Sequence, residues 1–314
     1  MKDNNKAYLL AISAVVFWST VATAFKLALR SLDFIQLLFL SSCTSLLTLI
    51  CLNLLRNKGK VFTFLALPKQ FPDNSNRDAP QLFQNKSPKL KFFLTEFFWG
   101  SINPFFYYLV LFSAYNLLRA QEAQAINYTW GITMAILSVF ILRQKLGIAE
   151  IIGIAISYFG VFIISVQGKI LQTDFSNIRG VLLAFVSTFI WASYWINRTR
   201  SKKDLVDCLI INFFSGTLLS FAALLLFSDF NFTRFGVTAS VYIGVFEMGL
   251  TFFIWNKALQ LTNKISRIST LIFLSPFLSL FFIRFFLGET ILWSTVAGLL
   301  LIITGLLLQN KSQP

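Results

Sequence analysis

The segment FIQLLFLSSCTSLLTLICLNLL, residues 34–55, contains 22 residues and no charged side chain. At a rise of about 1.5 Å per residue, a helix of this length extends about 33 Å, which is enough to cross the roughly 30 Å hydrocarbon core of a bilayer. Charged residues bound the segment on both sides, at Asp33 and Arg56. The segment therefore predicts a transmembrane helix.

Nine further runs of this kind occur along the chain. Their lengths lie between 16 and 22 residues, and only one of them is interrupted by a charged side chain, Glu247. Strands of a transmembrane barrel alternate apolar and polar residues. In residues 271–282, by contrast, apolar side chains occur at both odd- and even-numbered positions. We therefore expect an all-α polytopic membrane protein with about ten transmembrane helices. The other runs are Ala7–Phe25, Phe97–Leu118, Ala123–Leu142, Ile151–Gly168, Gly180–Asn197, Cys208–Ser228, Phe235–Asn256, Ile268–Ile283 and Thr290–Asn310.

The composition excludes an ordinary soluble enzyme. Of the 314 residues, 56% are hydrophobic and only 13% are charged, whereas soluble domains have about a quarter of their residues charged. The chain contains no histidine, so it has no imidazole for acid–base catalysis or metal binding. Its three cysteines, Cys43, Cys51 and Cys208, lack the spacing of a zinc or disulfide framework. We predict no catalytic centre, no metal and no cofactor.

Positive charges are concentrated in alternate connections between the predicted helices. The net charge is +14, and with a cytoplasmic N-terminus 20 of the 27 Lys and Arg residues fall on the cytoplasmic side and 7 on the other. Because short loops rich in Lys and Arg remain in the cytoplasm, both ends of the chain are predicted to be cytoplasmic. Topology and anionic headgroups account for this charge, so we expect the lipid bilayer, and no nucleic acid, as its partner.

The chain contains a weak internal repeat. Residues 130–131 align with residues 275–276 at a spacing of 145 positions, and Gly153 aligns with Gly298 at the same spacing. In addition, the Phe-Trp pair in the first run resembles the Ile-Trp pair at residues 190–191. We infer that the second half of the chain repeats the helical plan of the first.

The repeat divides the chain into two halves of five helices, residues 1–168 and 169–314, with a long connection at residues 56–91. Because five is odd, the second half enters the membrane from the opposite side, which gives an inverted repeat of the kind found in secondary transporters. The connection has a polar, proline-containing centre that is typical of disorder. We interpret it as a cytoplasmic linker associated with headgroups; a regulatory or partner-binding segment is the alternative.

Five short segments carry a resemblance to a known family. They are FWST (17–20), AINYTW (125–130), FEMG (246–249), LSP (274–276) and LGE (287–289). In this order, and within a plan of five plus five helices, they resemble the EamA-type drug/metabolite transporter superfamily. The resemblance implies an inner-membrane carrier for small metabolites, often an exporter of amino acids or related compounds. It also implies a central cavity lined by the first, third, fourth, sixth, eighth and ninth helices.

The sequence therefore favours a secondary-active transporter that works by alternating access, in which two related halves exchange roles around a site near the membrane midplane. Its partners would be a small-molecule substrate, the bilayer and, with proton coupling, a proton. One alternative is an integral-membrane enzyme acting on lipids or lipid-linked sugars. Another is a channel or a membrane protein that transports nothing.

Glu247 is the main candidate for a functional residue. It lies in the middle of its apolar run, where an ionisable group is costly unless it faces a cavity or a partner. We hypothesise that Glu247 binds a substrate amine or carries a coupling proton; a buried structural carboxyl is the alternative. At a spacing of 144 positions its counterpart in the first half is Asn103, which precedes Pro104.

Further polar and aromatic residues are candidates for lining the cavity. Asn127 can hydrogen-bond a carboxylate or an amide, whereas Tyr128 and Trp130 can form an aromatic wall or a cation–π contact with an amine. Location in an interfacial aromatic belt or plain helix packing is the alternative for the aromatic residues. The other candidates are Trp18 with Ser19, and Trp191 with Tyr194.

Two prolines lie inside predicted helices. Pro104 and Pro276 each remove a backbone donor, which we expect to kink the helix, and either proline is a candidate hinge. In contrast, the small residues Gly153, Ser157, Gly160, Gly298 and Gly305 are predicted to allow close contact between helices.

Several charged residues near helix ends are assigned to structure. Glu96 is expected to lie near the cytoplasmic end of the third helix and to reach the headgroups. Lys26, Arg30 and Arg284 are expected near outer ends, where long basic side chains extend to the interface. For Lys26, contact with an anionic group in the cavity is the alternative.

Overall fold

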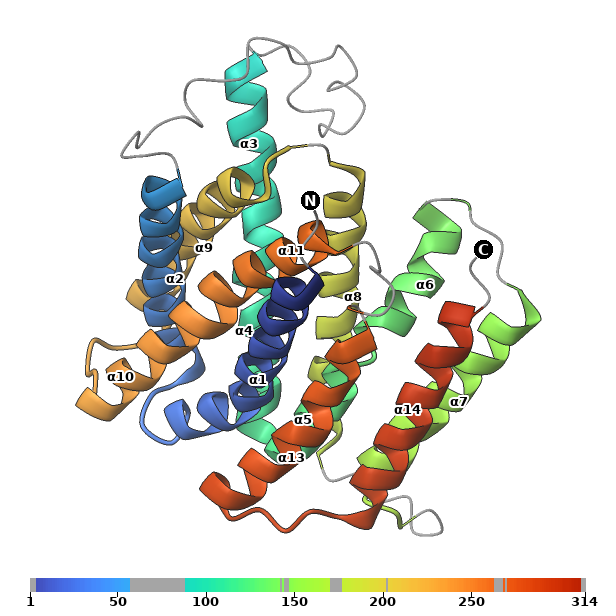
Figure 1. Cartoon of the computed structure of the whole chain (residues 1–314). Helices are drawn as coiled ribbons and strands as arrows, with labels where there is room; N and C mark the ends of the chain where they lie inside the picture. Colours follow the sequence, from blue (N-terminus) through green and yellow to red (C-terminus); the bar gives the residue numbers. More distant parts are fainter. Residues whose placement is uncertain are drawn as a thin grey trace.

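The computed structural model describes residues 4–56, 88–141, 143, 147–169, 177–201, 203–262, 268 and 270–311. Most of the predicted linker at 56–91 therefore lies outside the described residues. The described chain is a bundle of helices and contains no strand. Helix α1 begins and helix α14 ends on the same face of the bundle (Figure 1), here named the N-terminal face; the face on which α1 ends is named the opposite face.

The first half of the chain contains a long helix pair followed by shorter, interrupted helices. The elements are α1 (Asn4–Ala28), α2 (Phe34–Arg56), α3 (Pro88–Gly100), η3 (Ser101–Phe106), α4 (Tyr107–Leu117), α5 (Ala120–Asn127), α6 (Trp130–Ile141) and α7 (Ile148–Ser165).

The second half has a similar order of elements. They are α8 (Ile178–Arg200), α9 (Leu205–Phe227), α10 (Arg234–Tyr242), η4 (Ile243–Leu250), α11 (Thr251–Leu261), η5 (Thr270–Leu274), α13 (Ser275–Phe282), η6 (Ile283–Leu287) and α14 (Trp293–Lys311).

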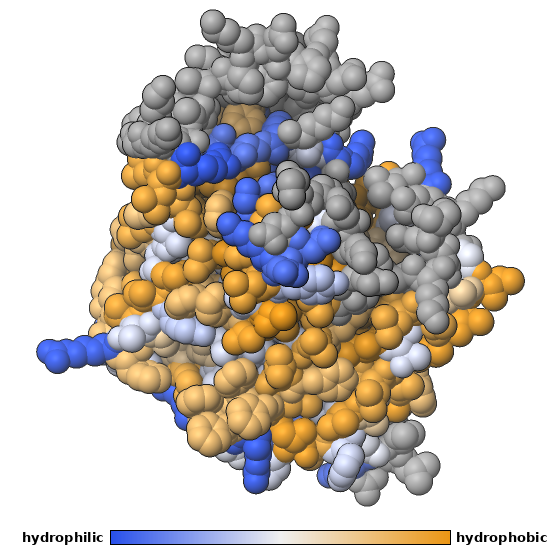
Figure 2. Space-filling model, in the orientation of Figure 1, coloured by the Kyte–Doolittle hydropathy of each residue, from blue (hydrophilic) through white to orange (hydrophobic). Residues whose placement is uncertain are grey.

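The described helices confirm a polytopic helical membrane protein. Within the described residues, seven helical spans are long and apolar enough to cross a membrane. Two shorter apolar helices are Leu271–Leu287 and Trp293–Leu308. Figure 2 shows hydrophobic side chains across the middle of the visible face, with most hydrophilic ones towards its two ends. Large apolar side chains are exposed, for example Phe227 at 76% and Phe285 at 72%, as a surface in contact with lipid requires.

Polar residues beside the apolar runs define where several helices begin. The Asp33 carboxylate accepts hydrogen bonds from the backbone N–H groups of Ile35 (2.7 Å) and Gln36 (2.9 Å) at the start of α2. Asp204 caps α9 in the same way. These side chains satisfy backbone donors that have no partner within the helix. Acidic residues close to the apolar runs thus fix where α2 and α9 begin.

Irregular backbone occurs at both prolines that the sequence singles out. Within η3, Asn103 has an extended conformation (φ −142°, ψ 118°) directly before Pro104. In the second half, η5 is a 3₁₀ helix and α13 starts at Ser275, with Pro276 in its first turn. The expected kink is therefore present at Pro104, whereas at Pro276 the backbone changes from a 3₁₀ helix to an α-helix. A kink at Pro276 and a hinge movement at either proline stay predictions. A third irregular segment, the π-helical η4, contains Glu247.

Helices from the two halves of the chain pack against one another. Helix α1 contacts α11 and α13, α2 contacts α9 and η4, α4 contacts α8, and α7 contacts α14. The last pair lies side by side in Figure 1. A Cβ atom at Gly160 would lie 2.6 Å from the carbonyl oxygen of Gly298, and one at Gly298 would lie 2.7 Å from that of Gly160. The predicted close contact through small residues is confirmed.

The expectation that Glu96 reaches the headgroups is wrong. Its side chain is completely buried and forms ion pairs with Arg198 (2.9 Å) and Lys203 (3.2 Å). The side-chain amide of Asn212 donates a 2.6 Å hydrogen bond to the Glu96 carbonyl oxygen. The error arises because α3 begins at Pro88 rather than Phe97, so Glu96 lies inside the helix and faces α8 and α9.

Candidate functional site

A cavity of about 490 Å³ lies among helices from both halves of the chain. Its size falls within the range of about 300–1,000 Å³ that is usual for small-molecule sites. The lining side chains are mostly aromatic or aliphatic, and they come from α1, α4, α5, α6, α8, α9, α11, η4 and η5, with Tyr128 following α5. Among the predicted site residues, the structure brings together Trp18, Asn127, Tyr128, Trp130, Trp191 and Glu247 in this lining.

Glu247 supplies the charge of the cavity, because it is the one charged residue in the lining that the structure describes. Its Oε1 accepts a 3.2 Å hydrogen bond from the hydroxyl of Tyr108 on α4. Its Oε2 is buried and has no hydrogen-bond partner among the described residues. A buried carboxylate oxygen without a partner is energetically costly, and a bound cation or a proton would satisfy it.

Aromatic rings form the walls around this carboxylate. The ring of Trp191 packs against that of Tyr107, with centroids 4.5 Å apart, and against that of Phe252 at 5.8 Å. The ring centroid of Trp18 lies 5.9 Å from that of Phe252 and 5.3 Å from that of Trp255. Aromatic faces carry negative potential and attract cations. The combination of a carboxylate and aromatic walls suits a ligand with an amine and an apolar body.

Asn127 contributes an oriented amide to the same cavity. Its Oδ1 accepts a hydrogen bond of 3.4 Å from the Tyr107 hydroxyl, and its Nδ2 donates one of 3.0 Å to Ser187 on α8. These contacts fix the side chain at the end of α5, where Tyr128 forms the next part of the wall. The cavity therefore holds a polar amide of the first half and a carboxylate of the second.

Three predicted residues lie outside the lining of this cavity. Ser19 is buried and its hydroxyl donates to the carbonyl oxygen of Val16 in its own helix. Tyr194 is buried and donates a 2.7 Å hydrogen bond to Asn212. Asn103 lies beside Tyr194, in the region of the Glu96 ion pairs. The structure thus separates these residues from the group around Glu247.

Sequence reasoning missed several lining residues, of which Tyr107, Phe252, Gln124 and Trp255 are examples. A signal for two of them was present, since Tyr107 and Phe252 are separated by 145 positions, the same spacing as Gly153 and Gly298. Gln124 and Trp255 carry no comparable signal, because polar and aromatic residues also occur at many positions outside the cavity.

The two ends of the cavity differ. Towards the opposite face, Phe25 packs against Phe112 and Tyr115, with ring centroids 4.8 Å and 5.2 Å apart. Towards the N-terminal face, the lining extends to Leu205, the first residue of α9, and to Leu259 near the end of α11. The cavity thus ends at an aromatic layer on one side and reaches the helix ends on the other.

These features define a helical membrane protein with a ligand-sized cavity between its helices. Residues 5–166 and 178–310 match the model of the EamA-like transporter family. The chain belongs to this family, and the resemblance found in the sequence is confirmed.

Known relatives of the chain carry transporter names. The chain is 28% identical over 171 residues to an uncharacterized transporter in the sor 3' region of Acidianus ambivalens, covering 54% of this chain and 66% of the relative. It is also 28% identical over 200 residues to the uncharacterized transporter YvbV of Bacillus subtilis (strain 168), covering 62% of this chain and 64% of YvbV. The chain thus spans slightly less than two thirds of the length of these relatives.

A solved structure supports the fold. A protein crystal structure superposes with a TM-score of 0.66 at 19% sequence identity, covering 99% of this chain and 100% of the other. At this identity the likeness concerns the fold alone. The arrangement of the helices therefore has a counterpart among experimental structures.

Proposed function

We propose that this membrane transporter is secondary-active and exports amino acids or related small metabolites by alternating access. The observation that carries the proposal is the cavity between helices of both halves, in which Glu247 has one oxygen without a partner among the described residues. A site at the junction of two related halves becomes accessible from either side when the halves move against each other.

The proposed topology has ten membrane crossings in two inverted halves, residues 1–168 and 169–314. In it, the elements from α3 to α4 form one crossing that is bent at η3, and the elements from η5 to η6 form another. The positive charges of the N-terminal face support a cytoplasmic location of both ends. We place the protein in the inner membrane of a bacterial cell because the resemblance to EamA-type transporters implies this location.

In the proposed site Glu247 binds the amine of the substrate or carries a coupling proton. Trp191, Trp18, Tyr128 and Trp130 line the path of the apolar part, and Asn127 orients a carboxylate or an amide. These roles are supported by the geometry of the lining, and by Glu247 being the one charged side chain among the lining residues that the structure describes. For Ser19, Asn103 and Tyr194, which lie behind the lining, we propose an indirect effect on binding.

In the proposed cycle the conformation described here accepts substrate from the cytoplasm. The aromatic layer around Phe25 separates the cavity from the outside, and rocking of the halves opens this layer while the N-terminal side closes. Pro104 and Pro276 are the proposed hinges. Energy comes from the substrate gradient, from a counter-substrate or from protons.

The experiment that tests this function measures uptake of labelled amino acids and nucleosides by proteoliposomes containing the purified protein. A carrier predicts saturable uptake that increases when unlabelled substrate is preloaded inside. Uptake that neither saturates nor responds to preloading would indicate a channel. No uptake of any compound by folded protein would favour an enzyme acting on lipids or a membrane protein that does not transport.

A further inference from the structure

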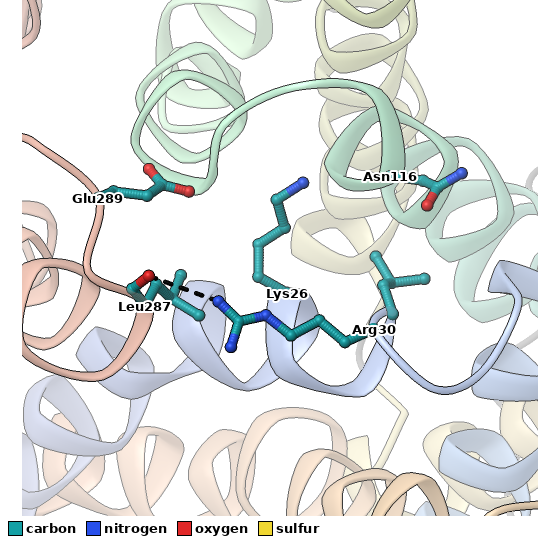
Figure 3. Close-up of a pocket in the computed structure, with 6 residues that line it drawn as sticks. Lys26, Arg30, Asn116, Leu287 and Glu289 are labelled. Atoms are coloured by element: carbon teal, nitrogen blue, oxygen red, sulfur yellow. Dashed lines mark hydrogen bonds between the residues drawn. The ribbon is translucent and has the colours of Figure 1, made fainter.

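A second, smaller pocket lies on the opposite face. It has a volume of about 260 Å³ and is lined by Lys26, Leu29, Arg30, Asn116, Leu287 and Glu289. Figure 3 shows Lys26 extending from α1 into the space between Glu289 and Asn116, with the Arg30 guanidinium directed at the backbone of Leu287. The pocket is thus built from the end of α1 and the residues just after it, the end of α4, and the end of η6 with the segment that follows.

Neighbouring residues on the same helices line the small pocket and the central cavity. On α1, Phe25 lines the cavity and Lys26 lines the pocket. On α4, Tyr115 lines the cavity and Asn116 lines the pocket. The Lys26 ammonium donates a 2.6 Å hydrogen bond to the carbonyl oxygen of Tyr115. One layer of residues therefore separates the two spaces, so a solute that passes this layer reaches Lys26 next.

Basic side chains outnumber acidic ones in the lining of the pocket. Lys26 and Arg30 are basic, and Glu289 is the only acid in the lining that the structure describes; Glu122 lies outside the lining and also interacts electrostatically with Lys26. The Glu289 carboxylate already accepts hydrogen bonds from the Ala120 backbone N–H (2.9 Å) and the Gln121 side chain (3.2 Å). Arg30 is exposed, and its one hydrogen bond within the described part of the chain is a 3.4 Å contact with the Leu287 carbonyl oxygen, so its other guanidinium donors are available to a ligand.

We propose that this pocket is an extracytoplasmic binding site for the carboxylate of a solute, held by Lys26 and Arg30. The planar Arg30 guanidinium can bind an oxyanion such as a carboxylate through two parallel hydrogen bonds. Glu289 and Glu122 offset part of the positive charge near Lys26, which favours a singly charged carboxylate over a phosphate dianion. The site rests on the proposed carrier function and orientation. If the exported compound binds at both sites, it carries a carboxylate as well as the amine that Glu247 recognises.

The test uses a reporter cysteine at the rim of the pocket. Cys43, Cys51 and Cys208 are replaced by serine or alanine, and Asn116→Cys is introduced. Impermeant anionic and cationic methanethiosulfonates are added outside intact cells, and their labelling rates are compared. We expect the ratio of anionic to cationic rates to fall about fivefold on Lys26→Gln, because a local positive charge concentrates anions. Lys26→Arg should retain the ratio, and the matched control Arg234→Gln, on the same face outside the pocket, should leave it unchanged.

Protection experiments identify the ligand class. Sodium acetate is expected to slow labelling more than sodium chloride or sodium phosphate of the same ionic strength. Equal effects of the three salts, stronger protection by phosphate, or a ratio unaffected by Lys26→Gln would overturn the proposal. Labelling requires no transport, so it can succeed when uptake fails. Labelling only in inside-out vesicles would overturn the extracytoplasmic placement and the orientation on which it rests.

Discussion

The hydroxyl of Tyr108 on α4 donates a 3.2 Å hydrogen bond to Oε1 of Glu247 on η4, between residues 139 positions apart in the chain. It links the first half of the chain to the charged residue of the central cavity. Because the other carboxylate oxygen has no partner among the described residues, this bond leaves Glu247 held on one side and open to a ligand on the other.

Replacing Tyr108 by phenylalanine removes this donor and keeps the ring. Hydrogen bonds to charged groups contribute about 1.5–3 kcal/mol, so we expect the concentration for half-maximal transport to rise by at least about tenfold. Tyr158→Phe is the matched control, since its hydroxyl contacts Thr133 and lies outside the lining of the cavity. Concentration dependence of uptake in proteoliposomes measures the effect. Equal half-saturation in both variants would contradict the role given to Tyr108.

Glu247→Gln keeps the size of the side chain and removes its capacity to exchange a proton. If Glu247 carries the coupling proton, transport by the wild type varies with pH and transport by this variant does not. The control is Glu150→Gln, at the start of α7 and outside the cavity. Initial rates measured over a pH series provide the comparison. A pH profile that Glu247→Gln leaves unchanged would remove Glu247 from proton coupling.

Trp191 lies at the centre of the aromatic wall. Trp191→Leu keeps an apolar side chain but removes the aromatic face, which attracts an amine by about 1 kcal/mol. We therefore expect about fivefold weaker binding of an amine substrate. Trp293→Leu serves as control because Trp293 is 86% exposed and does not line the cavity. Competition between labelled and unlabelled substrate gives the affinities, and equal losses in both variants would count against the wall.

The ion pairs of Glu96 predict a large effect on stability. Glu96→Ala leaves Arg198 buried without its carboxylate partner, and breaking a buried pair in this way costs about 3 kcal/mol. Arg56→Ala removes the exposed pair with Asp204 and should cost less than about 1 kcal/mol. Thermal unfolding in detergent tests the difference. Similar unfolding temperatures for the two variants would show that the buried pair contributes little.

The class of the fold could be predicted from the sequence because lipid imposes a strong constraint. A helix in the hydrocarbon core tolerates few charges, so the charge-free runs mark the helices. Asp33 and Asp204 then fix helix starts through local hydrogen bonds. Close packing of Gly160 against Gly298 was also predictable, since small residues recur at the repeat spacing.

The cavity could be predicted only in part. Trp18, Asn127 and Glu247 stand out as polar or amphipathic groups inside apolar runs, and they line it. Tyr107 was missed although the repeat spacing relates it to Phe252, because both are aromatic residues within apolar runs. In an apolar run the sequence does not distinguish an aromatic residue that faces a cavity from one that faces lipid.

The partners of Glu96 could not be predicted for another reason. Arg198 and Lys203 are 102 and 107 positions away, and they meet Glu96 only because α3 packs against α9 and α8 brings Arg198 to the same place. The local sequence shows where a charged residue would be costly to bury, but it does not show which distant residue compensates that charge.

The most direct test of the central claim is preload-stimulated uptake of the transported compound by proteoliposomes, comparing wild type with Glu247→Ala. A carrier with its site at Glu247 predicts stimulation in the wild type and its loss in the variant, with both proteins folded and reconstituted to the same level. Undiminished stimulation in Glu247→Ala would contradict the account, because transport would then proceed without the carboxylate on which the cavity is centred.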